Sequence, residues 1–146
     1  MTGSNIDSRI CNRCISYTEL VLGDEKEHDQ MKAMQLLKVW AAGNAAISAP
    51  TLWQYEVGNF LGREVAEEAT EKMDLLLHLK IRTIELSDTM YRACFAWMNK
   101  YKVSFYDASY LAVAHELQAV LVTADEKFVK KTRTIDRICL LKDINL

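Results

Sequence analysis

The sequence predicts an α/β fold, in which a central parallel sheet of about four to five short strands is flanked by helices. Short apolar runs alternate along the chain with longer segments of helical periodicity, and this alternation is typical of parallel strands covered on both faces. The length of 146 residues and the hydrophobic content of 50% fit one domain with a packed core. We therefore expect residues 1–146 to form a single domain, although residues 1–23 show no clear period.

The first expected element after that segment is a helix over residues 25–42, where apolar residues recur at spacings of three and four and Gly43 follows as a stop signal. The residues that carry this period are Met31, Met34, Leu37 and Ala41. Pro50 suits the first turn of the next helix, because that position needs no backbone donor. The other expected helices are 51–62, 64–80, one from the N-cap Ser87 to Tyr101, and 105–117, and the expected strands are 45–49, 81–86, 119–123 and 138–141.

Composition excludes several classes of protein. With 18 Lys and Arg against 20 Asp and Glu, the net charge is −2, so any contact with nucleic acid has to come from a local basic patch. The five glycines form no phosphate-binding loop. No stretch approaches the roughly 18 apolar residues of a membrane span, and Asp7 and Arg9 interrupt any secretory leader. We therefore expect a cytoplasmic chain that has no membrane contact and four reduced cysteines.

Three carboxylates occupy positions that invite a functional interpretation. Glu56 falls within the apolar side of its helix, Asp107 stands in the first turn of the next long helix, and Asp125 follows the strand that ends at Thr123. Each also has a structural explanation. Glu56 could lie at the edge of the apolar side, and Asp107 could be a favourable charge near the helix start that Ser104 caps. Asp125 could cap the following short helix. If the three converge at the sheet edge, a divalent cation would neutralise them, and Mg²⁺ or Mn²⁺ prefers such oxygen ligands.

Other constellations are weaker. The pair Cys11 and Cys14 is a lone Cys-x-x-Cys, for which zinc binding and redox chemistry both compete with plain reduced thiols. His115 is expected at the edge of the core rather than in catalysis. The tryptophans fall on helix stripes and suit the core or a dimer interface.

A dense basic stretch follows Asp125 directly. Such cations could position the phosphates of a nucleic acid beside an acidic metal site, although a solvated turn would explain them equally well. The stretch consists of Lys127, Lys130, Lys131 and Arg133.

Three runs in the second part of the chain resemble the PIN-domain ribonucleases, and most closely the VapC-type toxins of prokaryotic toxin–antitoxin pairs. The runs are SAPTLWQYEVGNFL (48–61), SFYDASYLAVAHEL (104–117) and LVTADEKF (121–128), in the order and with the separations of that family. The resemblance implies that Glu56, Asp107 and Asp125 are acidic metal-site residues supported by Asn59 and Thr123. It also implies a PIN-like α/β fold, Mg²⁺-dependent endonucleolytic cleavage of RNA, and a homodimer that pairs with an antitoxin.

The amino-terminal part departs from this family pattern. The family opens with an apolar strand that delivers a further aspartate, and two alignments of this chain disagree about its place. One alignment uses Asp7 in the run NIDSRI, whereas counting back from Val21-Leu22-Gly23-Asp24 puts Arg13 at that position. A missing carboxylate would remove one metal ligand. The alternative to an active toxin ribonuclease is therefore a catalytically impaired PIN-like module that binds protein or RNA, and a related DNA nuclease is a third possibility.

Overall fold

The computed structural model describes residues 13–15 and 27–145, with side chains described from residue 31 onward. Its centre is a five-stranded sheet in the order β3-β2-β1-β4-β5, and every neighbouring pair of strands is parallel. This confirms the predicted α/β class with a parallel sheet. The strands are β1 (Arg13–Ile15), β2 (Ile47–Pro50), β3 (Arg82–Ile84), β4 (Val120–Thr123) and β5 (Ile138–Leu140).

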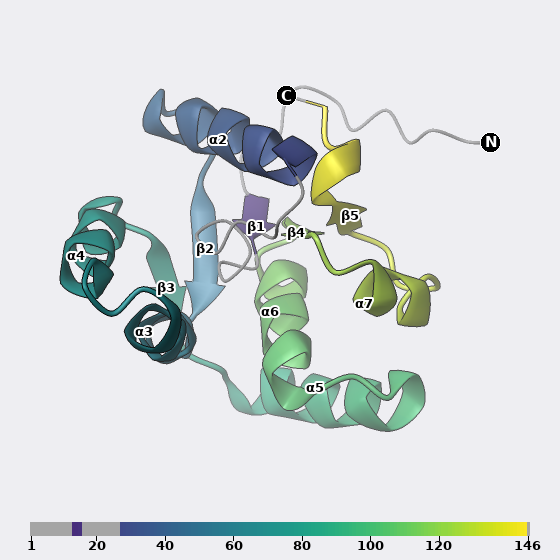
Figure 1. Ribbon diagram of the computed structural model, residues 1–146. Coiled ribbons are helices and arrows are strands. Elements are labelled where there is room, and N and C mark those ends of the chain that lie inside the picture. The colour runs from purple at the N-terminus through teal and green to yellow at the C-terminus, as the bar shows by residue number, and fades with distance from the viewer. Residues whose placement is uncertain (1–12, 16–26, 146) are drawn as a thin grey trace.

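Helices surround this sheet (Figure 1). Helix α6 contacts the three central strands and also packs along α5, whereas α3 packs on α4 and α2 packs on the 3-10 turn η1. Crossover helices are what parallel strands require, because each strand must return to the same end of the sheet. The helices are α2 (Glu27–Ala41), α3 (Trp53–Glu64), α4 (Ala69–His78), α5 (Asp88–Tyr101), α6 (Phe105–Glu116) and α7 (Glu126–Lys131), and η1 covers Leu141–Asp143.

The core is centred on α6. All seven residues from Ala108 to Ala114 are buried, so this helix is enclosed on every side, as its nearly continuous apolar sequence requires. Strands β2 and β4 contribute Ile47, Ala49, Leu121 and Val122 to the same core, and Trp53 is the largest side chain that is fully buried. The helix that carries Asp107 is therefore packed against the central strands of the sheet.

Local capping follows the sequence closely. The hydroxyl of Ser87 accepts a hydrogen bond from the backbone N–H of Met90 at 3.4 Å, and Ser104 accepts one from Asp107 at 3.0 Å. Both serines have the extended backbone that an N-cap needs. The expected starts of α5 and α6 are therefore confirmed.

Two local expectations are wrong. Pro50 is the last residue of β2, and the next helix begins only at Trp53, so the proline ends a strand instead of opening a helix. In α2, Met31 and Met34 are exposed and the buried residues are Ala33 and Leu36. Because α2 packs on η1, this tertiary contact decides which face of the helix is buried, and side-chain hydrophobicity alone does not.

The structure also bears on the expected helix bounds, the cysteines and the membrane. Helix α3 runs to Glu64, and α4 covers only part of the expected 64–80. Cys94 and Cys139 are free thiols, whereas Cys11 lies outside the described residues. Among residues 13–15 and 27–145 there is no helix with the length and apolar character needed to cross a bilayer.

Candidate carboxylate site

The candidate site lies at the edge of the sheet where the parallel strands end. β2 ends at Pro50 and leads into α3, and β4 ends at Thr123 and leads into α7. Carboxyl ends of parallel strands share one edge, and open α/β sheets usually place their ligands there. The start of α6 reaches the same edge, because its Asp107 interacts electrostatically with side chains of both α3 and α7.

Glu56 stands in the first turn of α3 and is half-buried. Its Oε2 accepts a hydrogen bond of 2.7 Å from the hydroxyl of Tyr110, which is itself buried in α6. Burial raises the pKa of the Glu56 carboxyl above its ordinary value, the Tyr110 hydroxyl lowers it, and the negative charge of Asp107 raises it again. Glu56 is thus a carboxylate with a fixed orientation and an unfavourable charge neighbour.

Asp107 is the carboxylate that interacts electrostatically with both of the others. Its pKa is raised mainly because the surrounding protein removes part of the water around the carboxyl. The negative charge of Asp125 raises the pKa further. The Ser104 hydroxyl and the Lys131 ammonium lower it, but these contributions do not reverse the shift. Since Asp107 also raises the pKa of Glu56, it interacts with each of the other two predicted carboxylates, and we call this set of three the carboxylate row.

Asp125 is fixed by a small network at the end of β4. Its Oδ1 accepts a hydrogen bond of 2.9 Å from the backbone N–H of Phe128, which makes it the N-cap of α7. Its own backbone N–H donates to the hydroxyl of the buried Thr123 at 3.1 Å. Thr123 therefore supports Asp125 through the backbone, and the structural and functional interpretations of Asp125 are compatible.

The donor chemistry fits a hard divalent cation, because all the groups in the row are oxygen donors and their repulsion is only partly compensated. As they lie, however, no three Asp, Glu, His or Cys side chains in the described part of the chain are close enough together to hold one ion. Asp7 lies outside the described residues. Arg13 begins β1 in register with Val120 at the opening of β4, about 10 Å of strand before the level of Thr123. The alignment that puts a site residue at Arg13 is therefore not supported by the strand register.

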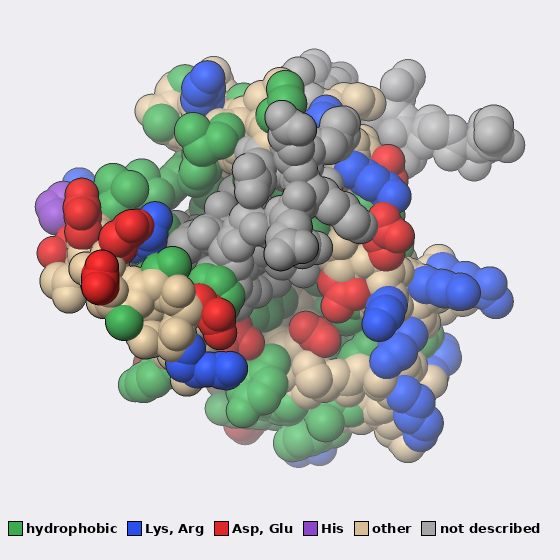
Figure 2. Space-filling view, viewed as in Figure 1, with side chains coloured by type: hydrophobic (Ala, Val, Ile, Leu, Met, Phe, Trp, Pro, Cys, Tyr) green, Lys and Arg blue, Asp and Glu red, His purple; other side chains and the backbone are tan. Residues whose placement is uncertain are grey.

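The remaining predicted residues lie around this row. Asn59 is exposed, one helical turn after Glu56. The predicted basic stretch is exposed along α7 and just beyond it. Figure 2 shows basic side chains gathered on the α7 side of the acidic group in the middle of the view. Lys131 donates a hydrogen bond to the carbonyl oxygen of Lys102 at 3.2 Å.

Sequence reasoning missed Tyr110. The signal was present, because Tyr110 follows Asp107 by three residues and lies in a run of residues that is otherwise almost entirely apolar. A tyrosine enclosed in such a helix needs a polar partner for its hydroxyl. Glu56 is such a partner, at a sequence separation of 54 residues, and this pairing could not be deduced without the fold.

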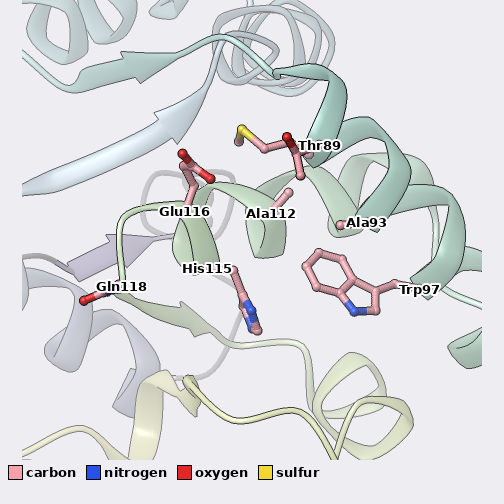
Figure 3. Close-up of a pocket in the computed structure, with 8 residues that line it drawn as sticks. Thr89, Ala93, Trp97, Ala112, His115, Glu116 and Gln118 are labelled. Atoms are coloured by element: carbon pink, nitrogen blue, oxygen red, sulfur yellow. The ribbon is translucent and has the colours of Figure 1, made fainter.

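His115 lies at the other end of α6, about 12 Å of helix from Asp107. It borders a separate cavity of about 250 Å³ between α5 and α6, where its ring meets the edge of Trp97 with centroids 5.1 Å apart (Figure 3). Its Nε2 lies 4.0 Å from Oδ1 of Asp136, and this buried nitrogen has no hydrogen-bond partner among the described residues. His115 therefore lies apart from Glu56, Asp107 and Asp125.

The fold is that of an α/β protein with a parallel sheet and flanking helices. Residues 12–133 match the PIN domain family, and the chain belongs to this family. The predicted resemblance is thereby confirmed. No curated protein sequence matches the chain.

Solved structures with the same fold include two toxin–antitoxin assemblies. A toxin–antitoxin complex from Klebsiella pneumoniae shares 19% identity at a TM-score of 0.61, covering 88% of this chain and 97% of that one. VapBC2 from Rickettsia felis, bound to a DNA fragment from their promoter, shares 18% identity at a TM-score of 0.64, with coverages of 88% and 96%. A protein of Pyrobaculum aerophilum shares 21% identity at a TM-score of 0.63, with coverages of 91% and 92%. At these identities the likeness establishes the fold.

Proposed function

We propose that this chain is a metal-dependent endoribonuclease of the VapC type, the toxin of a toxin–antitoxin pair. The observation that carries the proposal is the row formed by Glu56, Asp107 and Asp125, in which each outer carboxylate interacts with the central one. PIN domains are generally nucleases, and two structures of the same fold are toxin–antitoxin complexes. A cytoplasmic homodimer with an antitoxin partner belongs to the same proposal.

The chemistry follows from the donor set. Bound Mg²⁺ or Mn²⁺ would polarise the phosphodiester and lower the pKa of a water molecule. Glu56, Asp107 and Asp125 would hold the cation, Tyr110 would orient Glu56, and Thr123 would fix the backbone of Asp125. Asn59 would assist on the α3 side. The basic stretch Lys127, Lys130, Lys131 and Arg133 would hold the RNA backbone, since such contacts position a nucleic acid without reading its sequence.

The test is cleavage of a mixed-sequence RNA in Mg²⁺ by the wild type, Asp107→Asn and Asp88→Asn. Asp88 is the matched control, because it is an exposed aspartate in the first turn of α5. We expect Asp107→Asn to lower the cleavage rate by at least about 100-fold, because removing even a residue that only supports a metal ligand costs 10–100-fold. Asp88→Asn should retain the wild-type rate. Equal rates in folded wild type and Asp107→Asn would contradict the assignment.

A binding module without catalysis is the second candidate. It is favoured by the finding that no three potential ligand side chains in the described region are close enough to share an ion. Titration with Mn²⁺ separates the two candidates: the enzyme requires saturable binding that depends on the carboxylates, whereas the module requires none. A parallel DNA substrate tests whether the nuclease is restricted to RNA.

A further inference from the structure

A second cavity, of about 360 Å³, lies near the starts of α3 and α6, the helices that carry Glu56 and Asp107. It lies beyond the ends of β2 and β3, and its walls include Thr51, Glu85, Tyr91 and Phe105. The two polar residues come from neighbouring strand ends, which are joined by a hydrogen bond of 3.2 Å from the N–H of Thr51 to the carbonyl oxygen of Ile84. The cavity is thus a built feature of the same sheet edge as the proposed nuclease site.

The cavity and the carboxylates share the same helical turns. Leu52 lines the cavity and accepts a hydrogen bond through its carbonyl oxygen from the N–H of Glu56 at 3.1 Å. Phe105 lines it as well and precedes Asp107 by only two residues. A polynucleotide whose phosphate lies at the carboxylates would therefore have a neighbouring nucleotide within reach of this cavity.

The aromatic wall suits a planar ligand. The rings of Tyr91 and Phe105 are nearly parallel, with an angle of 16° between their planes and centroids 6.1 Å apart. The ring of Phe95 also contacts that of Phe105, with centroids 5.7 Å apart. Tyr91 is 43% exposed, and Figure 2 shows hydrophobic side chains gathered below the acidic group, where α5 and α6 lie. Unstacked RNA bases are commonly held by such aromatic surfaces.

We propose that this cavity receives one unstacked base of the RNA substrate, and that Glu85 selects guanine. The carboxylate of Glu85 has only acceptor atoms, and it can accept two parallel hydrogen bonds. Guanine alone among the four bases presents two adjacent N–H donors on its Watson–Crick edge, whereas the other bases place an acceptor beside each donor. The hydroxyl of Thr51 can donate or accept and so suits either remaining atom.

The choice of RNA as the ligand rests on the proposed function, but the cavity does not depend on it. A second copy of the chain is the competing occupant of an exposed aromatic surface. An apolar protein face would leave the Glu85 carboxylate without a partner inside the contact, which is costly. A base edge with two donors would satisfy it, and this favours RNA.

Binding without cleavage tests the proposal. Fluorescence anisotropy of labelled oligouridylates that carry one central guanine or adenine, measured in EDTA and low salt, gives the base preference. The wild type should bind the guanine oligonucleotide about tenfold more tightly. Glu85→Gln should reduce this preference to within about threefold, and Tyr91→Ala should weaken both oligonucleotides about tenfold. Glu71→Gln, an exposed glutamate of α4, is the matched control and should behave as the wild type.

Several results would overturn the proposal. The first two are equal binding of the guanine and adenine oligonucleotides and no measurable binding of either. A third is a guanine preference that survives Glu85→Gln. The fourth is a Tyr91→Ala variant that changes only the sedimentation coefficient, which would assign the surface to a second copy of the chain. The outcome is separable from the cleavage test. A preference that depends on Glu85 without cleavage in Mg²⁺ supports the cavity and contradicts the nuclease, and cleavage without any base preference does the reverse.

Discussion

Each end of α6 presents an ionisable side chain next to a carboxylate, but that side chain is itself acidic at the amino end (Asp107) and basic at the carboxyl end (His115). At the amino end, Asp107 faces Glu56 and Asp125, so like charges meet and the pKa values of Asp107 and Glu56 are raised. At the carboxyl end, His115 lies 4.0 Å from Asp136, a group that would neutralise an imidazolium. The difference teaches that like charges meet at the amino end, where the Lys131 ammonium offsets their repulsion only in part.

Among side chains that would not hold the cation themselves, the largest effect is expected from Tyr110→Phe, which removes the hydroxyl that orients Glu56 at the amino end. We expect a drop in cleavage of about tenfold, the lower range for residues that hold metal ligands in place. The dissociation constant for Mn²⁺ should rise, and the acid limb of the pH–rate profile should move to higher pH, because the hydroxyl lowers the pKa of Glu56.

Tyr101→Phe is the control for that variant. The hydroxyl of Tyr101 also makes a side-chain hydrogen bond, but its partner is Thr134, at 3.0 Å, and not one of the three carboxylates. It should leave the Mn²⁺ affinity and the pH profile unchanged. If both tyrosine variants shift these quantities alike, Tyr110 does not act through Glu56.

A smaller effect concerns stability and pH without metal. The folded-state pKa values of Glu56 and Asp107 are raised, so between the ordinary value near 4 and the raised value the folded protein binds more protons than the unfolded chain. Their contribution to the unfolding free energy therefore falls as pH increases through this window. Urea denaturation in EDTA should show Asp107→Asn gaining stability relative to the wild type with increasing pH.

Two controls sharpen the result of the denaturation series. Asp88→Asn should show no such pH-dependent gain, because Asp88 is exposed at the start of α5. Saturating Mn²⁺ should reverse the sign, since a ligand that binds only the folded wild type stabilises it. A relative stability of Asp107→Asn that is independent of pH would show that the repulsion is absent.

The smallest effect is expected at the other end of the helix. His115→Gln keeps a polar side chain but loses the ring that meets Trp97, and it should cost about 1 kcal/mol of unfolding free energy. Cleavage should stay within about twofold of the wild type, because this end of α6 lies outside the proposed site. A loss of activity comparable with that of Tyr110→Phe would remove the distinction between the two ends.

The sequence was sufficient for the α/β class, for most elements and for the N-caps Ser87 and Ser104, because these depend on local periodicity and on hydrogen bonds a few residues apart. It was insufficient where tertiary packing decides. The inner face of α2 has Ala33 and Leu36 instead of the two methionines. Pro50 ends a strand because it pairs with Ile84 of β3, a residue distant in sequence.

The candidate site divides in the same way. Glu56, Asp107 and Asp125 could be selected from their sequence context, and the fold brings them into one row. The Tyr110–Glu56 hydrogen bond and the Lys131 charge beside Asp107 join residues that are distant in sequence, so no local pattern contains them. The ambiguity between Asp7 and Arg13 was reduced only by strand register.

The account depends most on one claim, that the row of carboxylates binds a divalent cation. The direct measurement is a Mn²⁺ titration of the full chain, followed by electron paramagnetic resonance of the free ion, for the wild type, Asp107→Asn and Asp88→Asn. We predict saturable binding to the wild type and Asp88→Asn with the same dissociation constant, and at least about tenfold weaker binding to Asp107→Asn. Absence of binding to the wild type, or equal binding to all three proteins, would contradict the account.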